Sequence, residues 1–119
     1  MEILNVLTRV YLEPAKFEST IAFYQELFNQ EPEIKFAYEE MGLELAQIGS
    51  VLLIAGSEER LEPFLDTQAT ILVDELENCR EFLSSHGATI VEEPKSVPTG
   101  WNMLVKHPDG TLCEYVQHN

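Results

Sequence analysis

The residue types that most often carry chemistry are few in this sequence, and they form none of the common catalytic motifs. The histidines are His86, His107 and His118, and the cysteines are Cys79 and Cys113. No CxxC pair, glycine-rich phosphate loop, Gly-x-Ser-x-Gly elbow or HExxH helix occurs, so zinc-finger, P-loop, hydrolase and zincin chemistry lack support. We expect the histidines at the surface and Cys113, which has no neighbouring histidine to activate it, in the core.

The charge balance is the strongest signal in the composition. Among 119 residues, 21 are acidic and 7 are basic, which gives a formal net charge of −14. Such a surface repels nucleic-acid phosphates and anionic lipids, so both are disfavoured as partners, whereas a cationic ligand would be attracted. Solubility alone also explains the acidic excess and is the simpler interpretation.

Size, hydropathy and cysteine usage predict one soluble domain in a reducing compartment. The length suits a single domain, and 45% hydrophobic with 24% charged residues is ordinary for a globular protein. No apolar stretch approaches the ~18 residues of a membrane span, and the first residues lack the features of a signal peptide. Two cysteines far apart do not form a disulfide scaffold. We therefore expect a cytoplasmic protein.

Hydrophobic periodicity predicts the same order of elements twice along the chain. Alternating or continuous apolar runs predict strands at 4–12, 34–40, 43–48, 51–55, 68–73, 88–93, 101–106 and 111–117. Three-to-four spacing predicts helices from Phe17 to before Pro32 and from Leu76 to a cap at Gly87. Residues 56–65 are predicted as a polar connector with one helical turn, and residues 94–100 as a loop with two prolines.

This order, β-α-β-β-β in each half, indicates an internal duplication. Phe23-Tyr24 in the first helix matches Phe82-Leu83 in the second, and Gly49-Ser50 matches Gly110-Thr111 at nearly the same offset. We predict an α+β fold and a single domain over 1–119. Its two tandem βαβββ units would span about 1–57 and 67–119, with a connector at 58–66.

Two stretches resemble the vicinal-oxygen-chelate superfamily of glyoxalases, bleomycin-resistance proteins and dioxygenases. Residues 9–16 and 19–24 resemble its opening strand and helix. Residues 87–88, 93–94, 100–101 and 107–114 resemble its second half, with a Pro-Asp-Gly turn and then a glutamate on the final strand, here Glu114. The resemblance covers nearly the whole chain. It implies a curved mixed sheet around a cleft, with helices on the outer face, but one fold hosts many chemistries.

For catalytic members the resemblance implies a divalent metal held in the cleft by His, Glu or Gln. Glu114 retains the final-strand position, and Gln68 lies on or near the opening position of the second unit. The first-unit positions fall on Arg9 and at about Leu53, neither of which can ligate a metal. One carboxylate and one amide make a poor site. We therefore expect no cofactor; a divalent metal, if bound, would use Gln68 and Glu114.

Arg9 suggests a replacement for the metal. In the two-chain arrangement typical of the family, its guanidinium would lie near Glu114 and form a charge-assisted pair. The alternative, that Arg9 reaches solvent at a sheet edge, fits the sequence equally well. The resemblance also implies a homodimer, and the sequence leaves open whether the units pair within a chain or between chains.

Strand alternation indicates which side chains share a face with these two residues. It groups Leu7 and Tyr11 with Arg9, and Leu112 and Val116 with Glu114. An apolar groove with a few polar groups is typical of small-molecule sites. The predicted ligand-binding residues are Arg9, Tyr11, Gln68, Trp101 and Glu114. Trp101 at the cleft mouth is no better supported than Trp101 in ordinary packing, and the faces of Phe36 and Tyr38 stay open.

Three functions are compatible with these observations. The first, which we favour, is a metal-free protein of the glyoxalase or bleomycin-resistance type that binds a small organic molecule, such as a cationic drug or metabolite. The second is a metal-dependent lyase or isomerase of the glyoxalase type, with Gln68 and Glu114 as ligands and Glu114 as the catalytic proton-transfer group. The third is a structural or regulatory protein with an empty cleft. The sequence does not decide whether the chain is an enzyme.

Overall fold

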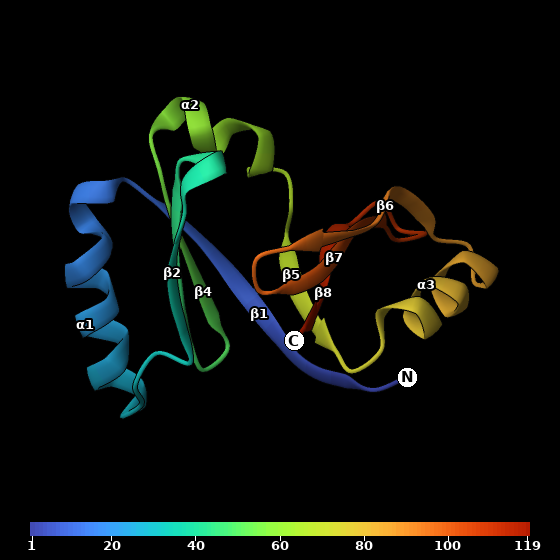
Figure 1. Ribbon diagram of the computed structural model, residues 1–119, viewed down its shortest axis with the longest axis horizontal. Coiled ribbons are helices and arrows are strands. Elements are labelled where there is room, and N and C mark those ends of the chain that lie inside the picture. The colour runs from blue at the N-terminus through green and yellow to red at the C-terminus, as the bar shows by residue number, and fades with distance from the viewer. The chain divides into compact units, whose positions relative to one another are not determined.

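The computed structural model describes all 119 residues, and contacts divide them into two compact units (Figure 1). Residues 7–65 form one, here called the N-terminal unit. Residues 66–119 form the other, the C-terminal unit, together with residues 1–6. Asp74 holds these first residues, since its carboxylate accepts a hydrogen bond from the Glu2 N–H (2.7 Å) and its own N–H donates to the Glu2 carbonyl (3.2 Å).

The N-terminal unit follows the predicted order of one strand, one helix and three strands. Its elements are β1 (Ile3–Leu12, from residue 7 onward), α1 (Phe17–Phe28), β2 (Ile34–Tyr38), β3 (Leu43–Ile48), β4 (Val51–Ala55) and the short α2 (Glu58–Leu61) in the predicted connector. The strand order is β2-β3-β4-β1, with β4 parallel to β1 and the other neighbours antiparallel. Helix α1 covers one face of these strands (Figure 1), where Phe17 and Ile21 are buried with Ala46, Ile48 and Leu53.

The C-terminal unit repeats this arrangement. Its elements are β5 (Ala69–Val73), α3 (Leu76–Ser85), β6 (Thr89–Val97), β7 (Gly100–Lys106) and β8 (Leu112–His118). The strand order is β5-β8-β7-β6, with β5 parallel to β8. Because β5 corresponds to β1 and β8 to β4, the two units have the same topology. The predicted α+β fold with two βαβββ units is therefore confirmed.

Helix α3 covers one face of the C-terminal strands and closes a second core. Leu76 and Cys79 of the helix are buried with a group of strand residues, namely Val73, Met103, Val105, Cys113 and Tyr115. Both cysteines are free and buried, as predicted for Cys113. At the edge of this core the Arg80 guanidinium donates two hydrogen bonds (2.6 and 2.9 Å) to the Glu93 carboxylate, which ties α3 to β6. None of the helices is both long and apolar enough to span a membrane.

The predicted loop at residues 94–100 is wrong over its first part, because β6 continues through Pro94 to Val97. Strand β6 is the last strand in the sheet order, so it has one neighbour, β7. Its register against β7 shifts between Ile90 and Glu92 and again between Glu92 and Lys95. An edge strand tolerates proline at such a bulge because no second neighbour requires its missing N–H.

The core of the N-terminal unit gives a direct test of this packing. Leu53 on β4 is 0% exposed, whereas Leu27 on α1 is 60% exposed. We expect Leu53→Ala to lower the free energy of unfolding by about 2–5 kcal/mol, through lost apolar burial and the cavity left behind. The matched Leu27→Ala should change it by less than about 0.5 kcal/mol. Urea denaturation followed by circular dichroism measures both, and equal losses would contradict the assigned core.

The core of the C-terminal unit predicts a loss of stability at alkaline pH. Burial, with a smaller contribution from Cys79 and Cys113, raises the pKa of Tyr115 to about 12 from its ordinary value of 10.0. The unfolded chain then ionises this phenol before the folded chain does. The stabilisation is complete below pH 10 and is lost as pH rises toward 12, by roughly 1–3 kcal/mol.

The comparison protein for this effect is Tyr115→Phe, which has no ionisable group at the position. Urea unfolding at pH 9 and pH 11 should show a larger fall in the wild-type chain than in the variant, because the other tyrosines contribute equally to both. An equal fall in the two proteins would show that Tyr115 ionises as readily in the folded chain as in the unfolded one.

Candidate functional site

Glu114 carries a carboxylate with a fixed orientation. It lies on the face of the C-terminal strands that α3 does not cover. Glu114 is half-buried on β8, and its neighbours in sequence, Cys113 and Tyr115, point into the core beneath α3. The Thr70 hydroxyl donates to Glu114 Oε1 (3.1 Å), and the Asn102 side-chain amide donates to Oε2 (3.2 Å). Thr70 is only 2% exposed. Each carboxylate oxygen is thus oriented by a neutral donor.

Strand register explains why these three side chains meet. Thr70 on β5 lies directly opposite Glu114 on β8, and residues opposite each other in register share a face. On the other side of β8, Leu104 lies opposite Glu114 and Asn102 lies two residues along the same strand. The apolar residues on this face, in the same register, are Leu72, Leu104, Leu112 and Val116. The same register also places Lys106 of β7, and Glu92 and Lys95 of β6, on this face. The oriented carboxylate therefore lies among aliphatic side chains on a face that carries further charges at its β6 side.

Gln68 does not join this group. It is exposed just before β5, its backbone N–H donates to the Leu112 carbonyl (2.8 Å), and its side-chain amide donates to the Asp66 carbonyl (3.2 Å). Thr70 takes the place beside Glu114 that the sequence suggested for a residue on or near Gln68. Strand alternation could have identified Thr70 from the sequence, because Thr70 lies two residues after Gln68 and its side chain therefore points to the same face. Asn102 could have been found by counting the hairpin register outward from the Pro-Asp-Gly turn.

Arg9 and Tyr11 form a second oriented group, in the N-terminal unit. Arg9 Nε donates to the Tyr11 hydroxyl (2.7 Å), which in turn donates to the Phe64 carbonyl (2.6 Å). Both side chains lie on the face of β1 that α1 leaves uncovered, because Val10 and Leu12 pack against the core beneath α1. The predicted association of Arg9 with Tyr11 on one face is therefore seen. Arg9 and Glu114 belong to different units, so their ion pair stays a prediction.

The register also settles which residues share the face of Arg9. Leu52 lies opposite Arg9 and Ile54 lies opposite Tyr11, whereas Leu53 is buried beneath α1 on the other face. The sequence estimate of the first-unit position at about Leu53 is therefore corrected to Leu52, since side chains alternate along β4. Neither leucine can ligate a metal.

The two aromatic residues of β2 lie on the face of Arg9 as well. Phe36 pairs with Leu45, which pairs with Ile54, and Tyr38 lies two residues along β2 from Phe36. Their ring centroids are 5.9 Å apart, and both side chains are half-buried. This aromatic pair adds apolar surface to the Arg9 face, on which the sequence had left Phe36 and Tyr38 unplaced.

The structure does not bring Trp101 to the face of Glu114. Trp101 lies opposite Gln117 in the β7–β8 register, one residue out of phase with Asn102 and Glu114. Its side chain is therefore on the face of Met103 and Tyr115, and it is 46% exposed. A role for Trp101 in a ligand site with Glu114 would require the opposite phase of β7.

The donor atoms around Glu114 do not fit a divalent metal. The cluster offers one carboxylate, one hydroxyl and one amide, and both the hydroxyl and the amide donate hydrogen bonds to that carboxylate. Transition metals prefer imidazole and thiolate, and hard cations prefer several carboxylates. No group of three or more His, Cys, Asp or Glu side chains that could hold a metal occurs in the chain.

Comparison with solved structures identifies proteins of the same architecture. An uncharacterized protein from Methanosarcina mazei is 45% identical, with a TM-score of 0.86 over 100% of this chain and 95% of that one. Methylmalonyl-CoA epimerase from Mycobacterium tuberculosis is 18% identical, with a TM-score of 0.72 over 98% of this chain and 89% of the other.

A further similar structure contains a ligand. Streptomyces coelicolor methylmalonyl-CoA epimerase in complex with 2-nitronate-propionyl-CoA is 16% identical, with a TM-score of 0.69 over 98% and 96% of the two chains. At these low identities the two epimerases show likeness of fold. No protein-family model and no curated protein matches the chain.

The donor set predicts the outcome of a metal-binding experiment. We expect no site tighter than about 10 μM for Zn²⁺, Ni²⁺, Co²⁺ or Mn²⁺ in the wild-type chain, because one carboxylate with neutral donors supplies too few ligands. Thr70→His should gain affinity, since it places an imidazole beside Glu114. Elemental analysis after dialysis and calorimetric titration measure both proteins. One equivalent of metal on the wild-type chain, lost in Glu114→Gln, would contradict the assignment.

Proposed function

We propose that this chain, which is in one family with the Methanosarcina mazei protein and has the fold of methylmalonyl-CoA epimerase, is a vicinal-oxygen-chelate protein that binds a small organic molecule without a resident divalent metal. The observation that carries this proposal is the Glu114 group, in which Thr70 and Asn102 orient a carboxylate beside the aliphatic side chains of Leu72, Leu104, Leu112 and Val116. An oriented carboxylate beside aliphatic side chains suits a ligand with an N–H donor or a positive charge on an apolar body.

The overall charge supports a cationic ligand in particular. With 21 acidic and 7 basic residues, the chain attracts organic cations and repels polyanions at long range. The Streptomyces coelicolor enzyme binds a coenzyme A derivative, a class of ligand that carries several phosphate charges. The acidic excess of this chain disfavours such a polyanionic ligand. The likeness of fold alone is therefore no reason to assign a coenzyme A derivative to this chain.

The N-terminal unit has a candidate binding surface of its own, with apolar side chains and oriented hydrogen-bonding groups. Arg9 is oriented by Tyr11, and the Phe36–Tyr38 pair lies on the same face. Aromatic and aliphatic surface with a few oriented polar groups is the usual composition of sites for small organic molecules. We assign Arg9 and Tyr11 to ligand binding on this basis. The homodimer and the cytoplasmic location stay predictions.

The alternative is a metal-dependent lyase or isomerase of the glyoxalase type. Its support is the likeness of fold to the methylmalonyl-CoA epimerases. Against it, the side-chain amide of Gln68 bonds to Asp66 rather than lying beside Glu114, and the other positions that resemble metal ligands hold Arg9 and a leucine. Glu114 would retain a proton-transfer role only in this alternative.

A thermal-shift screen tests the proposal. The panel contains small organic ammonium and amidinium ions in one arm and acyl-CoA thioesters, with and without divalent metal, in the other. We expect hits among the cations, because a ligand at 100 times its Kd adds about 2.7 kcal/mol of stability. Glu114→Gln, which keeps the size and removes the charge, should lose the hits that bind at the Glu114 face.

Glu59→Gln is the matched control, since Glu59 is an exposed residue of α2 and its substitution removes the same charge elsewhere. It should retain the hits of the wild-type chain. Stabilisation by an acyl-CoA thioester that depends on added metal and on Glu114 would favour the epimerase-like alternative. Equal loss of cation binding in both variants would show that general surface charge attracts the cation. That outcome would contradict a site at Glu114.

A further inference from the structure

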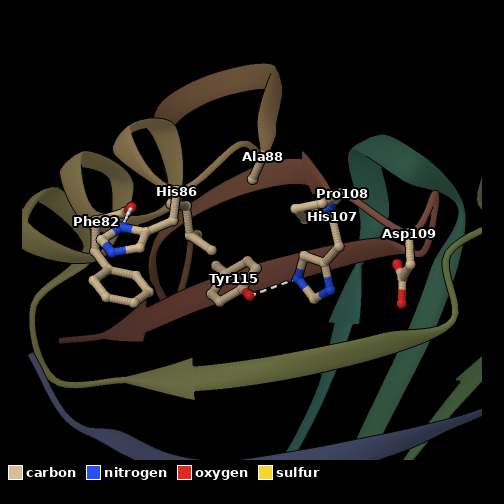
Figure 2. Close-up of a pocket in the computed structure, with 8 residues that line it drawn as sticks. Phe82, His86, Ala88, His107, Pro108, Asp109 and Tyr115 are labelled. Carbon is tan, nitrogen blue, oxygen red and sulfur yellow. Dashed lines mark hydrogen bonds between the residues drawn. The ribbon is translucent and has the colours of Figure 1, made fainter.

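A second candidate site lies wholly within the C-terminal unit, on the side of the strands that carries α3. A pocket of about 370 Å³ opens between the C-terminal end of α3 and the turn that joins β7 to β8 (Figure 2). Its apolar lining includes Phe82 and Leu83 of the helix, and its polar lining comes from His86, His107, Asp109 and Tyr115. The volume is near the lower end of the range for small-molecule sites. Tyr115 and Glu114 are consecutive on β8, so this pocket and the Glu114 face lie on opposite faces of the strand.

The hydrogen bonds of His86 define what it offers to the pocket. Its Nδ1 lies 2.7 Å from the Phe82 carbonyl oxygen and 3.1 Å from the Ser85 hydroxyl. A carbonyl oxygen can only accept, so Nδ1 carries the proton and Nε2 of the neutral ring has a lone pair. The His86 and Phe82 rings are stacked with centroids 4.0 Å apart. His86 therefore contributes an acceptor beside an aromatic surface.

Tyr115 and His107 supply a second acceptor at the floor of the pocket. The Tyr115 hydroxyl lies 2.7 Å from His107 Nε2 (Figure 2). Burial raises the pKa of Tyr115 to about 12, so the phenol keeps its proton at neutral pH. Whether the phenol donates to His107 Nε2 or accepts from it is set by the tautomer of His107. In either case the phenol oxygen retains a lone pair.

Asp109 adds a carboxylate to the pocket, and His107 is its basic neighbour there. Its Oδ1 accepts a hydrogen bond from the Thr111 backbone N–H (2.9 Å), which orients the carboxylate in the turn. Hydrogen bonds from Thr111 lower the pKa of Asp109, so the group is anionic at neutral pH. No Lys or Arg side chain forms a salt bridge with it. The pocket therefore presents a carboxylate together with His86 Nε2 and the Tyr115 oxygen as polar contacts.

We propose that this pocket binds a small organic ammonium or amidinium ion with an aromatic or aliphatic body. The N–H donors of such a ligand match the Asp109 carboxylate, His86 Nε2 and the Tyr115 oxygen. Its apolar body and its charge match Leu83 and the ring of Phe82, which is 46% exposed and available for cation–π contact. The net charge of −14 raises the local concentration of cations.

Benzylamine is the probe, and benzyl alcohol is its neutral counterpart. Titration of the ¹⁵N-labelled full-length chain, followed by ¹H–¹⁵N correlation spectra, should show saturable shifts at residues 82–88 and 107–115. We expect a Kd on the order of 1 mM for so small a ligand. Benzyl alcohol should produce much weaker shifts, because it lacks the charge that Asp109 recognises.

Two substitutions of equal charge separate a site from a surface effect. Asp109→Asn keeps an oxygen acceptor for the Thr111 N–H and should weaken benzylamine binding about tenfold through loss of a charge-assisted contact. Asp66→Asn removes one charge from an exposed residue outside the pocket and should leave the Kd unchanged. Phe82→Leu should weaken binding through loss of the aromatic face. Shifts outside the pocket, equal binding of benzyl alcohol, or equal weakening in Asp66→Asn and Asp109→Asn would each overturn the proposal.

The Glu114→Gln variant distinguishes this site from the one proposed above. If the pocket is the site, Glu114→Gln leaves the benzylamine shifts at residues 82–88 and 107–115 intact, whether or not the Glu114 face binds a ligand. If benzylamine binding is lost in Glu114→Gln and retained in Asp109→Asn, the ligand binds at the Glu114 face and the pocket proposal is wrong.

Discussion

The alternation of side chains along β8 connects the core of the C-terminal unit to both of its candidate sites. Cys113 and Tyr115 must point toward α3, because they complete a core with Cys79 and Met103. Glu114 between them then has to point to the other face. A slip of one residue would bury the carboxylate beneath α3 and expose Tyr115, so the hydrophobic core fixes the position of the functional carboxylate.

The strands on either side of β8 orient the Glu114 carboxylate. Strand β5 pairs with β8 in parallel and brings Thr70 opposite Glu114, whereas β7 pairs with it antiparallel and brings Asn102 to the other carboxylate oxygen. Because Thr70 is nearly fully buried, its hydroxyl needs a partner in the protein, and Glu114 provides it. The orientation of Glu114 is therefore a property of the folded sheet and does not depend on a bound ligand.

Sequence periodicity predicted the elements well because each of them buries one apolar face. The two helices, the eight strands and the duplication all follow from that pattern. Glu114 was found through the family resemblance, whose hallmark is a Pro-Asp-Gly turn followed by a glutamate on the final strand. Prediction failed where the outcome depends on a neighbouring strand. Pro94 continues an edge strand because β6 has a single partner. Trp101 has the opposite phase from Glu114, and Thr70 and Asn102 were missed, because register between strands is a tertiary property.

The chemistry of the Glu114 group also explains why a metal site was a natural expectation and why its residues do not support one. A divalent ion orients a carboxylate and compensates its charge at the same time, but it needs several ligands with available lone pairs. Thr70 and Asn102 orient the same carboxylate by donating hydrogen bonds to it. A group built in this way is prepared to hold a carboxylate in place for a donor-bearing or cationic ligand. The pocket beneath the other face has a related composition, since Asp109 is held by Thr111 and the neighbouring His86 and Tyr115 offer acceptors. In an acidic chain, binding of an organic cation at either site would relieve charge repulsion rather than add to it.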